Sequence, residues 1–265
     1  MNRRERHKQA KEDRGGGKRG KAASHAFIDP HYDDTLALDA QLNEAVEHHR
    51  AGRLSEAEKI YRQILDADPE YPHALCLLGV IAHTAGQNEQ ALELITRAIA
   101  VKPDYADAHC NLGIVLRAEE RNEEALTSIN TALTLNPNYV EALTNKGILL
   151  RQRGQYDEAV KNFRDAIALN PDLAEPNYNL GNTLRELAQM DDAVASFQKA
   201  IALKPDYAEA HNNLGNTLRE LGRFDEAVAS FQKALAIKPD HFEAHSNLGS
   251  VRQKQGRLDE AVASY

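Results

Sequence analysis

The residue types that most often carry catalysis are scattered in this chain. It has eleven histidines and two cysteines, and it lacks an HExxH sequence, a glycine-rich phosphate loop and a GxSxG sequence. His48 and His49 are adjacent, so on a helix their side chains point about 100° apart and are poorly placed to ligate one ion. The sequence therefore predicts no catalytic centre, no metal site and no cofactor.

Asparagines with a fixed spacing are the stronger functional signal. Six of them lie 34 residues, or a multiple of 34, apart: Asn43, Asn111, Asn145, Asn179, Asn213 and Asn247. Asn182 and Asn216 each follow one of these by three residues, which is close to one helical turn. An amide offers both a donor and an acceptor, which suits the backbone of an extended peptide. We expect either a row of peptide-binding amides or structural asparagines that bond the scaffold itself.

Charged residues recur with the same interval. The arginines are Arg117, Arg151, Arg185 and Arg219, and the acids are Asp107, Glu141, Glu175, Glu209 and Glu243. The acids fall at the expected start of a helix, where they would act in capping. The arginines fall near a helix C-terminus, where they would favour the helix dipole or contact acidic ligand groups, and both roles stay open.

These intervals reflect a repeat that occupies most of the chain. The segment Ala208–His241 matches Ala174–Tyr207 at 24 of 34 positions. Prolines recur at the same spacing: Pro69, Pro103, Pro137, Pro171, Pro205 and Pro239. A fixed period of this length is typical of a solenoid in which each repeat contacts only its neighbours.

Each unit predicts two helices. In the unit that begins at Ala208, Leu214 and Leu218 define an apolar stripe, and Gly222 is a left-handed stop after the first helix. Asp206 is expected to cap the first helix and Asp225 the second. Small residues at positions 8, 20 and 27 of the unit allow the paired helices to pack closely: Gly215, Ala227 and Ala234.

This pattern resembles the tetratricopeptide repeat, in which positions 8 and 20 are small, position 24 is aromatic, position 27 is Ala and position 32 is Pro. The matching residues in one unit are Gly215, Ala227, Phe231, Ala234 and Pro239. The expected repeats cover 38–71, 72–105, 106–139, 140–173, 174–207, 208–241 and a partial unit, 242–265. The resemblance implies an all-α, right-handed solenoid whose first helices line a concave groove, with the asparagines along it at position 6.

Two groups within this family make different predictions. Chaperone-binding domains hold a C-terminal carboxylate with a clamp that includes lysine at position 5, and no lysine occurs there in this chain: the residues are Leu42, Cys76, Cys110, Thr144, Tyr178, Asn212 and Ser246. The long array with Asn at position 6 is more similar to the arm of the O-linked N-acetylglucosamine transferases. In those enzymes the asparagine row carries the protein substrate towards a C-terminal catalytic domain.

The remaining histidines and the cysteines are interpreted as structural. His109, His211 and His245 share position 4, where the family favours a bulky ring. Cys76 and Cys110 share position 5 of adjacent repeats, so they should lie about 10 Å apart, beyond the reach of a disulfide. We expect both to be reduced thiols.

The first residues differ in kind from the repeats. Residues 1–24 carry nine Lys or Arg against three acids, a net charge of +6, which leaves −14 for the remainder because the chain total is −8. We expect a disordered basic tail over 1–24 and a linker over 25–37, with Asp33 or Asp34 capping the first helix. An arm for nucleic acid or an anionic membrane is the alternative for this tail. The tail contains no aromatic residue that could stack on a base and no convincing amphipathic stripe.

Some repeats depart from the pattern. Glu119 and Glu120 replace the turn glycine in repeat 3, and Lys146 replaces leucine at position 7 of repeat 4. The seventh unit stops at Tyr265, in the middle of its second helix, which predicts that the chain is part of something longer.

Taken together, these features predict a cytoplasmic, non-enzymatic scaffold that binds a protein or peptide, with no small-molecule substrate, nucleic acid or membrane as its partner. The alternative is the substrate-recognition arm of a glycosyltransferase whose catalytic domain lies beyond this chain.

Overall fold

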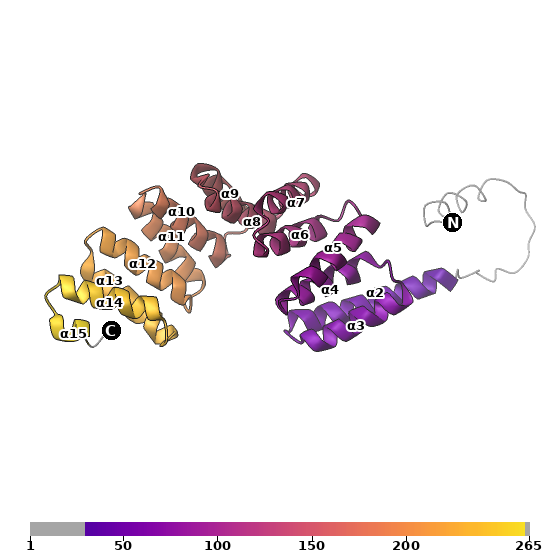
Figure 1. Cartoon of the computed structure of the whole chain (residues 1–265), viewed down its shortest axis with the longest axis horizontal. Helices are drawn as coiled ribbons and strands as arrows, with labels where there is room; N and C mark the ends of the chain where they lie inside the picture. Colours follow the sequence, from indigo (N-terminus) through magenta and orange to yellow (C-terminus); the bar gives the residue numbers. More distant parts are fainter. Residues whose placement is uncertain (1–29, 263–265) are drawn as a thin grey trace, which may run out of the picture. The chain divides into compact units, whose positions relative to one another are not determined.

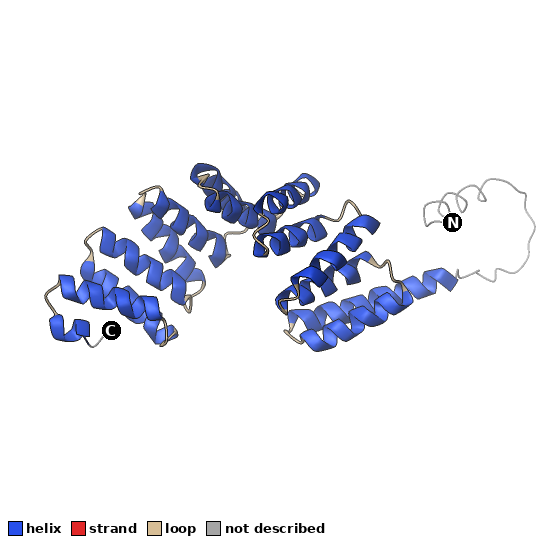
Figure 2. Ribbon diagram, viewed as in Figure 1, coloured by secondary structure: helices blue, strands red, loops and turns tan. Residues whose placement is uncertain are grey.

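The computed structural model describes residues 30–262, with side chains from Leu36 onward. The expected basic tail, 1–24, lies outside the described residues. Every described element is a helix (Figures 1 and 2). In chain order they are α2 (Pro30–Arg50), α3 (Leu54–Ala67), α4 (Pro72–Thr84), α5 (Asn88–Val101), α6 (Ala106–Ala118), α7 (Asn122–Leu135), α8 (Val140–Gln152), α9 (Tyr156–Leu169), α10 (Ala174–Glu186), α11 (Met190–Leu203), α12 (Ala208–Glu220), α13 (Phe224–Ile237), α14 (Phe242–Lys254) and α15 (Leu258–Val262). These helices confirm the all-α solenoid.

The chain divides into two compact units, residues 1–41 and 42–265, and the boundary falls inside α2. Helix α2 begins at Pro30, upstream of Asp33 and Asp34, so the expectation that either residue caps it is wrong. The helix also occupies part of the segment 25–37, for which we expected a linker.

Within residues 42–265, the helices are arranged in two layers. The first helices of successive repeats contact one another directly: α4, α6, α8, α10, α12 and α14. Each second helix packs against the first helix of its own repeat and against the first helix of the next. The first helices therefore form a continuous layer, and the second helices cover one side of it.

Close approach within the helix pairs of repeats 2 to 6 depends on the glycine at position 8. A Cβ atom added to Gly215 would lie 2.6 Å from Phe231 Cε1, which is too close for any real contact. Phe231 is fully buried, as are the residues at position 24 of the other repeats: Tyr61, Ile95, Ile129, Phe163 and Phe197. The steric reason expected for the small residues is confirmed at this position.

The turn between the paired helices is left-handed in every described repeat. Gly222 has φ of +75°, as expected for its role as a stop, and nothing lies within 4 Å of a Cβ added there. Two repeats place a different residue in this conformation, Glu120 with φ of 60° and Ala188 with φ of 57°. A side chain costs free energy in this region, since its Cβ crowds the following carbonyl.

The expected helix caps are wrong. The N-cap of α12 is Tyr207 rather than Asp206, and that of α13 is Arg223 rather than Asp225; neither forms a side-chain capping bond. Arg223 instead pairs with Glu226 in the first turn, at 2.6 Å. The first-turn acids favour the helix dipole without capping.

Candidate peptide-binding surface

The position-6 asparagines lie on the layer of first helices, but they are not equally accessible. Asn43 is exposed, Asn145 and Asn179 are buried, and the other three are partly buried. Asn145 Nδ2 donates to the Glu141 carbonyl at 3.0 Å, and Asn179 Nδ2 donates to the Glu175 carbonyl at 3.2 Å. These two amides therefore donate hydrogen bonds within their own helices.

Three of the asparagines instead reach the preceding repeat. Asn111 Nδ2 donates to Cys76 Sγ at 3.4 Å, and Asn247 Nδ2 donates to Asn212 Oδ1 at 3.1 Å. In the same way, Asn213 Nδ2 donates to the Tyr178 hydroxyl at 3.1 Å. Position 6 of one repeat therefore bonds position 5 of the repeat before it, and the residue at position 5 sets the chemistry of the pair.

These bonds join into one network on α10, α12 and α14. Asn213 Nδ2 also donates to Asn182 Oδ1 at 2.8 Å, and Asn212 Nδ2 donates to Asn213 Oδ1 at 3.4 Å. With both donors of Asn213 engaged, the Tyr178 hydroxyl proton and the Asn182 amide protons stay available to a ligand. Asn216 lies about one helical turn after Asn213, and its Oδ1 atom is buried without a hydrogen-bond partner among the described residues.

A groove of about 530 Å³ opens over this network. Its lining residues are Tyr178, Glu209, Asn212, Asn213, Lys238, Asp240, His241, Phe242 and Glu243. Phe242 is 80% exposed, and the Tyr178 ring stacks against that of Tyr207 with 4.8 Å between centroids. The groove thus combines exposed aromatic surface with oriented amides.

The position-12 arginines are partly buried: Arg117, Arg151, Arg185 and Arg219. The Nε atoms of Arg117 and Arg151 are buried and have no hydrogen-bond partner within residues 30–262. Burial lowers the pKa of Arg117, while Glu175, two repeats further along, acts in the opposite direction. The charge of a carboxylate on the same surface thus favours the protonated form of Arg117.

The position-2 acids lie in the first helical turns, as expected, and they influence one another. Burial raises the pKa of Glu141 above its ordinary value, and the charges of Glu175 and Asp107 raise it further. This row gives the surface an acidic edge next to its arginines.

The structure brings two groups to this surface that the asparagine pattern did not select. Tyr178 and Asn212 lie at position 5, where the sequence shows only that the lysine of a carboxylate clamp is absent. This position is cysteine in repeats 2 and 3 and changes to Tyr178 and Asn212 in repeats 5 and 6, and that change could have marked them as site residues. Phe242 had no such signal, because its exposure depends on packing.

The histidines and cysteines behave as the structural interpretation predicts. Nε2 of His109, His211 and His245 lies 2.9 to 3.1 Å from the carbonyl oxygen of the preceding repeat's position-32 proline. Cys76 and Cys110 are free and buried, and burial raises their pKa values to about 11 and about 12. No cluster of three potential metal ligands occurs among the described side chains.

Comparison with known families agrees with this architecture. Models described as TPR repeat match residues 147–188, 181–218 and 215–256, and models described as Tetratricopeptide repeat match 48–112, 106–139 and 129–161. The chain belongs to the tetratricopeptide repeat family. No curated protein matches the sequence.

Several solved structures share the fold. The crystal structure of MamA is 28% identical, with a TM-score of 0.54 over 58% of this chain and 90% of that one. YrrB, described as a TPR protein with an unusual peptide-binding site, is 22% identical, with a TM-score of 0.55 over 69% of this chain and 95% of that one. PilF of Pseudomonas aeruginosa is 19% identical, with a TM-score of 0.71 over 85% and 99% of the two chains.

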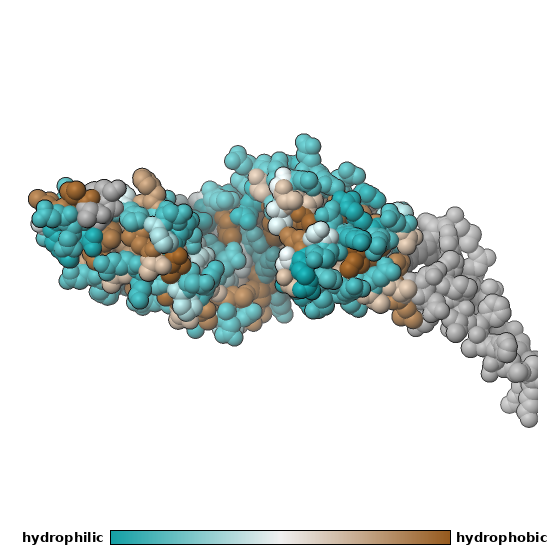
Figure 3. Space-filling view, turned by 90° about the horizontal axis from the view of Figure 1, so that it is seen from below, coloured by the Kyte–Doolittle hydropathy of each residue, from teal (hydrophilic) through white to brown (hydrophobic). Residues whose placement is uncertain are grey.

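These likenesses show the fold of the chain. None of the helices described between residues 30 and 262 is both long and apolar enough to cross a membrane. In the space-filling view, hydrophobic residues on the visible face are interspersed with hydrophilic ones (Figure 3).

Proposed function

We propose that the layer of first helices binds an extended protein segment, with its centre at the groove over α10, α12 and α14. The observation that carries this proposal is the juxtaposition of the amide network with Phe242, whose ring is 80% exposed. Amides oriented by bonds to a neighbouring repeat lose little side-chain entropy when a ligand arrives.

Chemically, the network suits a peptide backbone. The Asn182 amide protons and the Tyr178 hydroxyl proton would donate to ligand carbonyls, and Asn247 Oδ1 would accept from a ligand N–H. Phe242 and the stacked pair Tyr178 and Tyr207 offer aromatic surface to a ligand side chain. Arg185 and Arg219 are the nearest cations of the position-12 row in sequence, and in this proposal they attract acidic flanks of the segment.

The row divides into two parts in this proposal. Asn213, Asn247, Asn182 and Asn216 form the binding region, and Asn111 extends it towards the first repeats. Asn145 and Asn179 contribute little, since their amides already bond within their own helices. In this proposal, Arg117 and Arg151 attract acidic groups of the segment to the same face, at repeats 3 and 4.

The test is selection of binders from a degenerate nonapeptide library on the immobilised chain, followed by affinity measurements on the enriched peptides. Asn213→Ala and Phe242→Ala should each lower affinity about tenfold, equivalent to about 1.4 kcal/mol. Asn179→Ala is the matched control and should change affinity less than about twofold, with circular dichroism confirming that all variants keep their helicity. Unchanged affinity in both test variants would contradict the proposal.

The recognition arm of a glycosyltransferase is the second candidate, since the asparagine row resembles that of the O-linked N-acetylglucosamine transferases. It predicts that the reading frame continues beyond the Tyr265 codon into a sugar-transfer domain. Sequencing the source DNA downstream distinguishes the candidates: a catalytic α/β region favours the arm, and a stop codon soon after Tyr265 favours a free-standing scaffold.

A further inference from the structure

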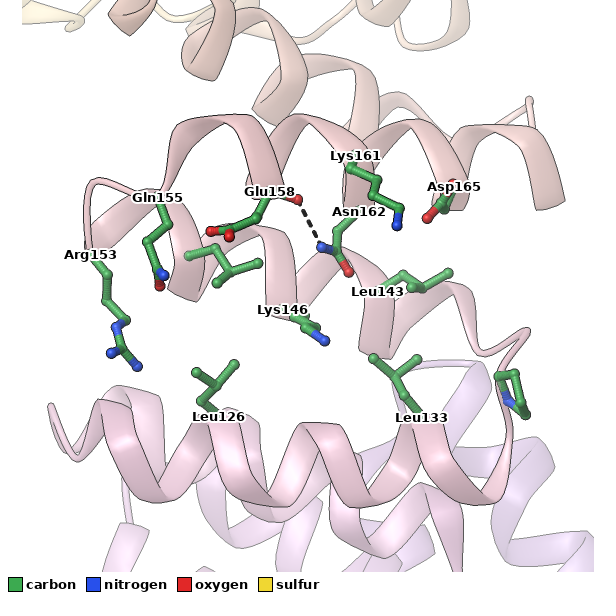
Figure 4. Close-up of a pocket in the computed structure, with 12 residues that line it drawn as sticks. Leu126, Leu133, Leu143, Lys146, Arg153, Gln155, Glu158, Lys161, Asn162 and Asp165 are labelled. Atoms are coloured by element: carbon green, nitrogen blue, oxygen red, sulfur yellow. Dashed lines mark hydrogen bonds between the residues drawn. The ribbon is translucent and has the colours of Figure 1, made fainter.

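A lysine interrupts the apolar stripe of the fourth repeat. Position 7 is leucine in five other repeats: Leu78, Leu112, Leu180, Leu214 and Leu248. In the fourth repeat it is Lys146, on α8, and its side chain extends into the space between α7 and α9 (Figure 4). This space lies between second helices, whereas the amide network lies on the layer of first helices.

The space is a groove of about 600 Å³. Leucines from α7 and α8 form its apolar walls: Leu126, Leu133, Leu143 and Leu150. Helix α9 and its N-cap residue, Gln155, contribute the polar rim: Gln155, Glu158, Lys161, Asn162 and Asp165. Pro137 and Arg153 complete the lining at its ends.

Equivalent grooves in the preceding repeats provide an internal comparison. The groove with Leu112 at its floor has a volume of about 350 Å³, and the one with Leu78 at its floor has about 370 Å³. In both of these the leucine supplies the apolar contact that the repeat pattern prescribes. The groove at Lys146 is larger, and it is the one of the three that has a cation at its floor.

The rim of this groove also differs from that of its neighbour. In the Leu112 groove, Arg121 pairs with Glu124 at 2.7 Å. The corresponding residues here are Gln155 and Glu158, so this ion pair is missing and Glu158 has no side-chain partner in the described part of the chain. The Lys146 groove therefore lacks the ion pair that holds the rim side chains of the Leu112 groove together.

The charges of the groove leave the Lys146 ammonium without a partner. Arg153 pairs with Glu123 of α7 at 3.0 Å, and Asn162 Nδ2 donates to the Glu158 carbonyl at 2.8 Å. Lys146 forms no hydrogen bond or ion pair within residues 36–262, and neither does Lys161. Three cations, of which Arg153 is already paired, and two acids thus surround the leucine walls of the groove.

We propose that this groove is a second interaction site, and that it binds a protein segment in which an aspartate or glutamate lies next to leucine-like side chains. The carboxylate pairs with Lys146, assisted by Lys161, while the aliphatic side chains pack against Leu126 and Leu133. An ion pair among aliphatic walls is screened less than one on an open surface, so it adds both affinity and a requirement for the acid. Glu158 and Asp165 at the rim disfavour segments with several adjacent acids.

The test uses the whole chain with leucine methyl groups labelled for NMR. The probe is an acetylated and amidated decapeptide of alternating leucine and glutamate, compared with the same peptide carrying glutamine in place of glutamate. We expect the glutamate peptide to shift the methyl signals of Leu126, Leu133, Leu143 and Leu150, and the glutamine peptide to bind about tenfold more weakly. Leu92 and Leu116, in the equivalent groove above Leu112, are the internal control and should not shift.

The decisive variant is Lys146→Leu, which restores the residue of the other repeats and should therefore keep the fold. It should lower the affinity of the glutamate peptide about tenfold and remove its advantage over the glutamine peptide. Equal binding of the two peptides to the unaltered chain, or unchanged binding by Lys146→Leu, would overturn the proposal. So would the absence of methyl shifts at about 1 mM peptide, or shifts that follow protein concentration without peptide, since the latter would make a second copy the occupant.

Discussion

The layer of first helices has the same backbone frame in repeats 2 and 3 as in repeats 5 to 7, but its side-chain contacts differ. In the first region, Asn111 bonds the buried thiol of Cys76 at 3.4 Å. In the second, Asn213 bonds Tyr178 and Asn182, and Asn247 bonds Asn212, beneath an open groove. Two changes turn a closed contact into a polar network: cysteine gives way to Tyr178 and Asn212 at position 5, and Val80 gives way to Asn182 at position 9. The frame and the binding chemistry therefore vary independently.

The largest expected effect tests whether the frame is common to both regions. Gly215→Ala should lower the free energy of unfolding by about 2 kcal/mol, because the added Cβ meets the Phe231 ring. Gly113→Ala should cost a similar amount through its contact with Ile129. Chemical denaturation measures both changes, and Gln232→Ala, an exposed change on α13, is the control. A loss below about 0.5 kcal/mol in either glycine variant would mean that the helices of that repeat separate easily.

A second prediction sharpens the difference between the regions. Asn213→Leu should lower the free energy of unfolding by about 1 to 2 kcal/mol, because two hydrogen-bond partners lose their donor. Asn111→Leu should cost about 0.5 kcal/mol or less, since a sulfur atom is a weak acceptor. Denaturation midpoints of the two variants provide the comparison, and a cycle with Tyr178→Phe isolates the coupling at Asn213. Equal losses would show that the two contacts are energetically alike.

The smallest effect concerns the one irregular turn in each region. Ala188→Gly and Glu120→Gly should each raise the free energy of unfolding by about 0.5 kcal/mol, because glycine adopts positive φ without crowding its Cβ. Gly222→Ala is the matched control and should change stability in the opposite direction. Thermal unfolding of the three variants is the measurement. Destabilisation by both glycine substitutions would show that flexibility of the unfolded chain outweighs strain at this turn.

The repeat frame of this protein follows from local features of its sequence. The 34-residue period, the glycine opposite a large residue and the turn glycine are local requirements, and they predict the helix pairs because each acts within one repeat. The helix caps were predicted wrongly because packing chose the cap residue: Tyr207 is the N-cap of α12, and its ring packs against that of Tyr178 on α10. A local capping preference of about 1 kcal/mol does not outweigh packing of that kind.

Which asparagines meet solvent depends on how the repeats pack against one another. The sequence places Asn145, Asn179 and Asn213 at the same repeat position, yet the first two bond their own helices and the third bonds the preceding repeat. The same holds for Lys146, which the sequence shows only as an irregular residue and which the structure places at the floor of a groove formed by three helices. Burial and partner choice depend on side chains about 34 residues away, so no single repeat contains the information that decides them.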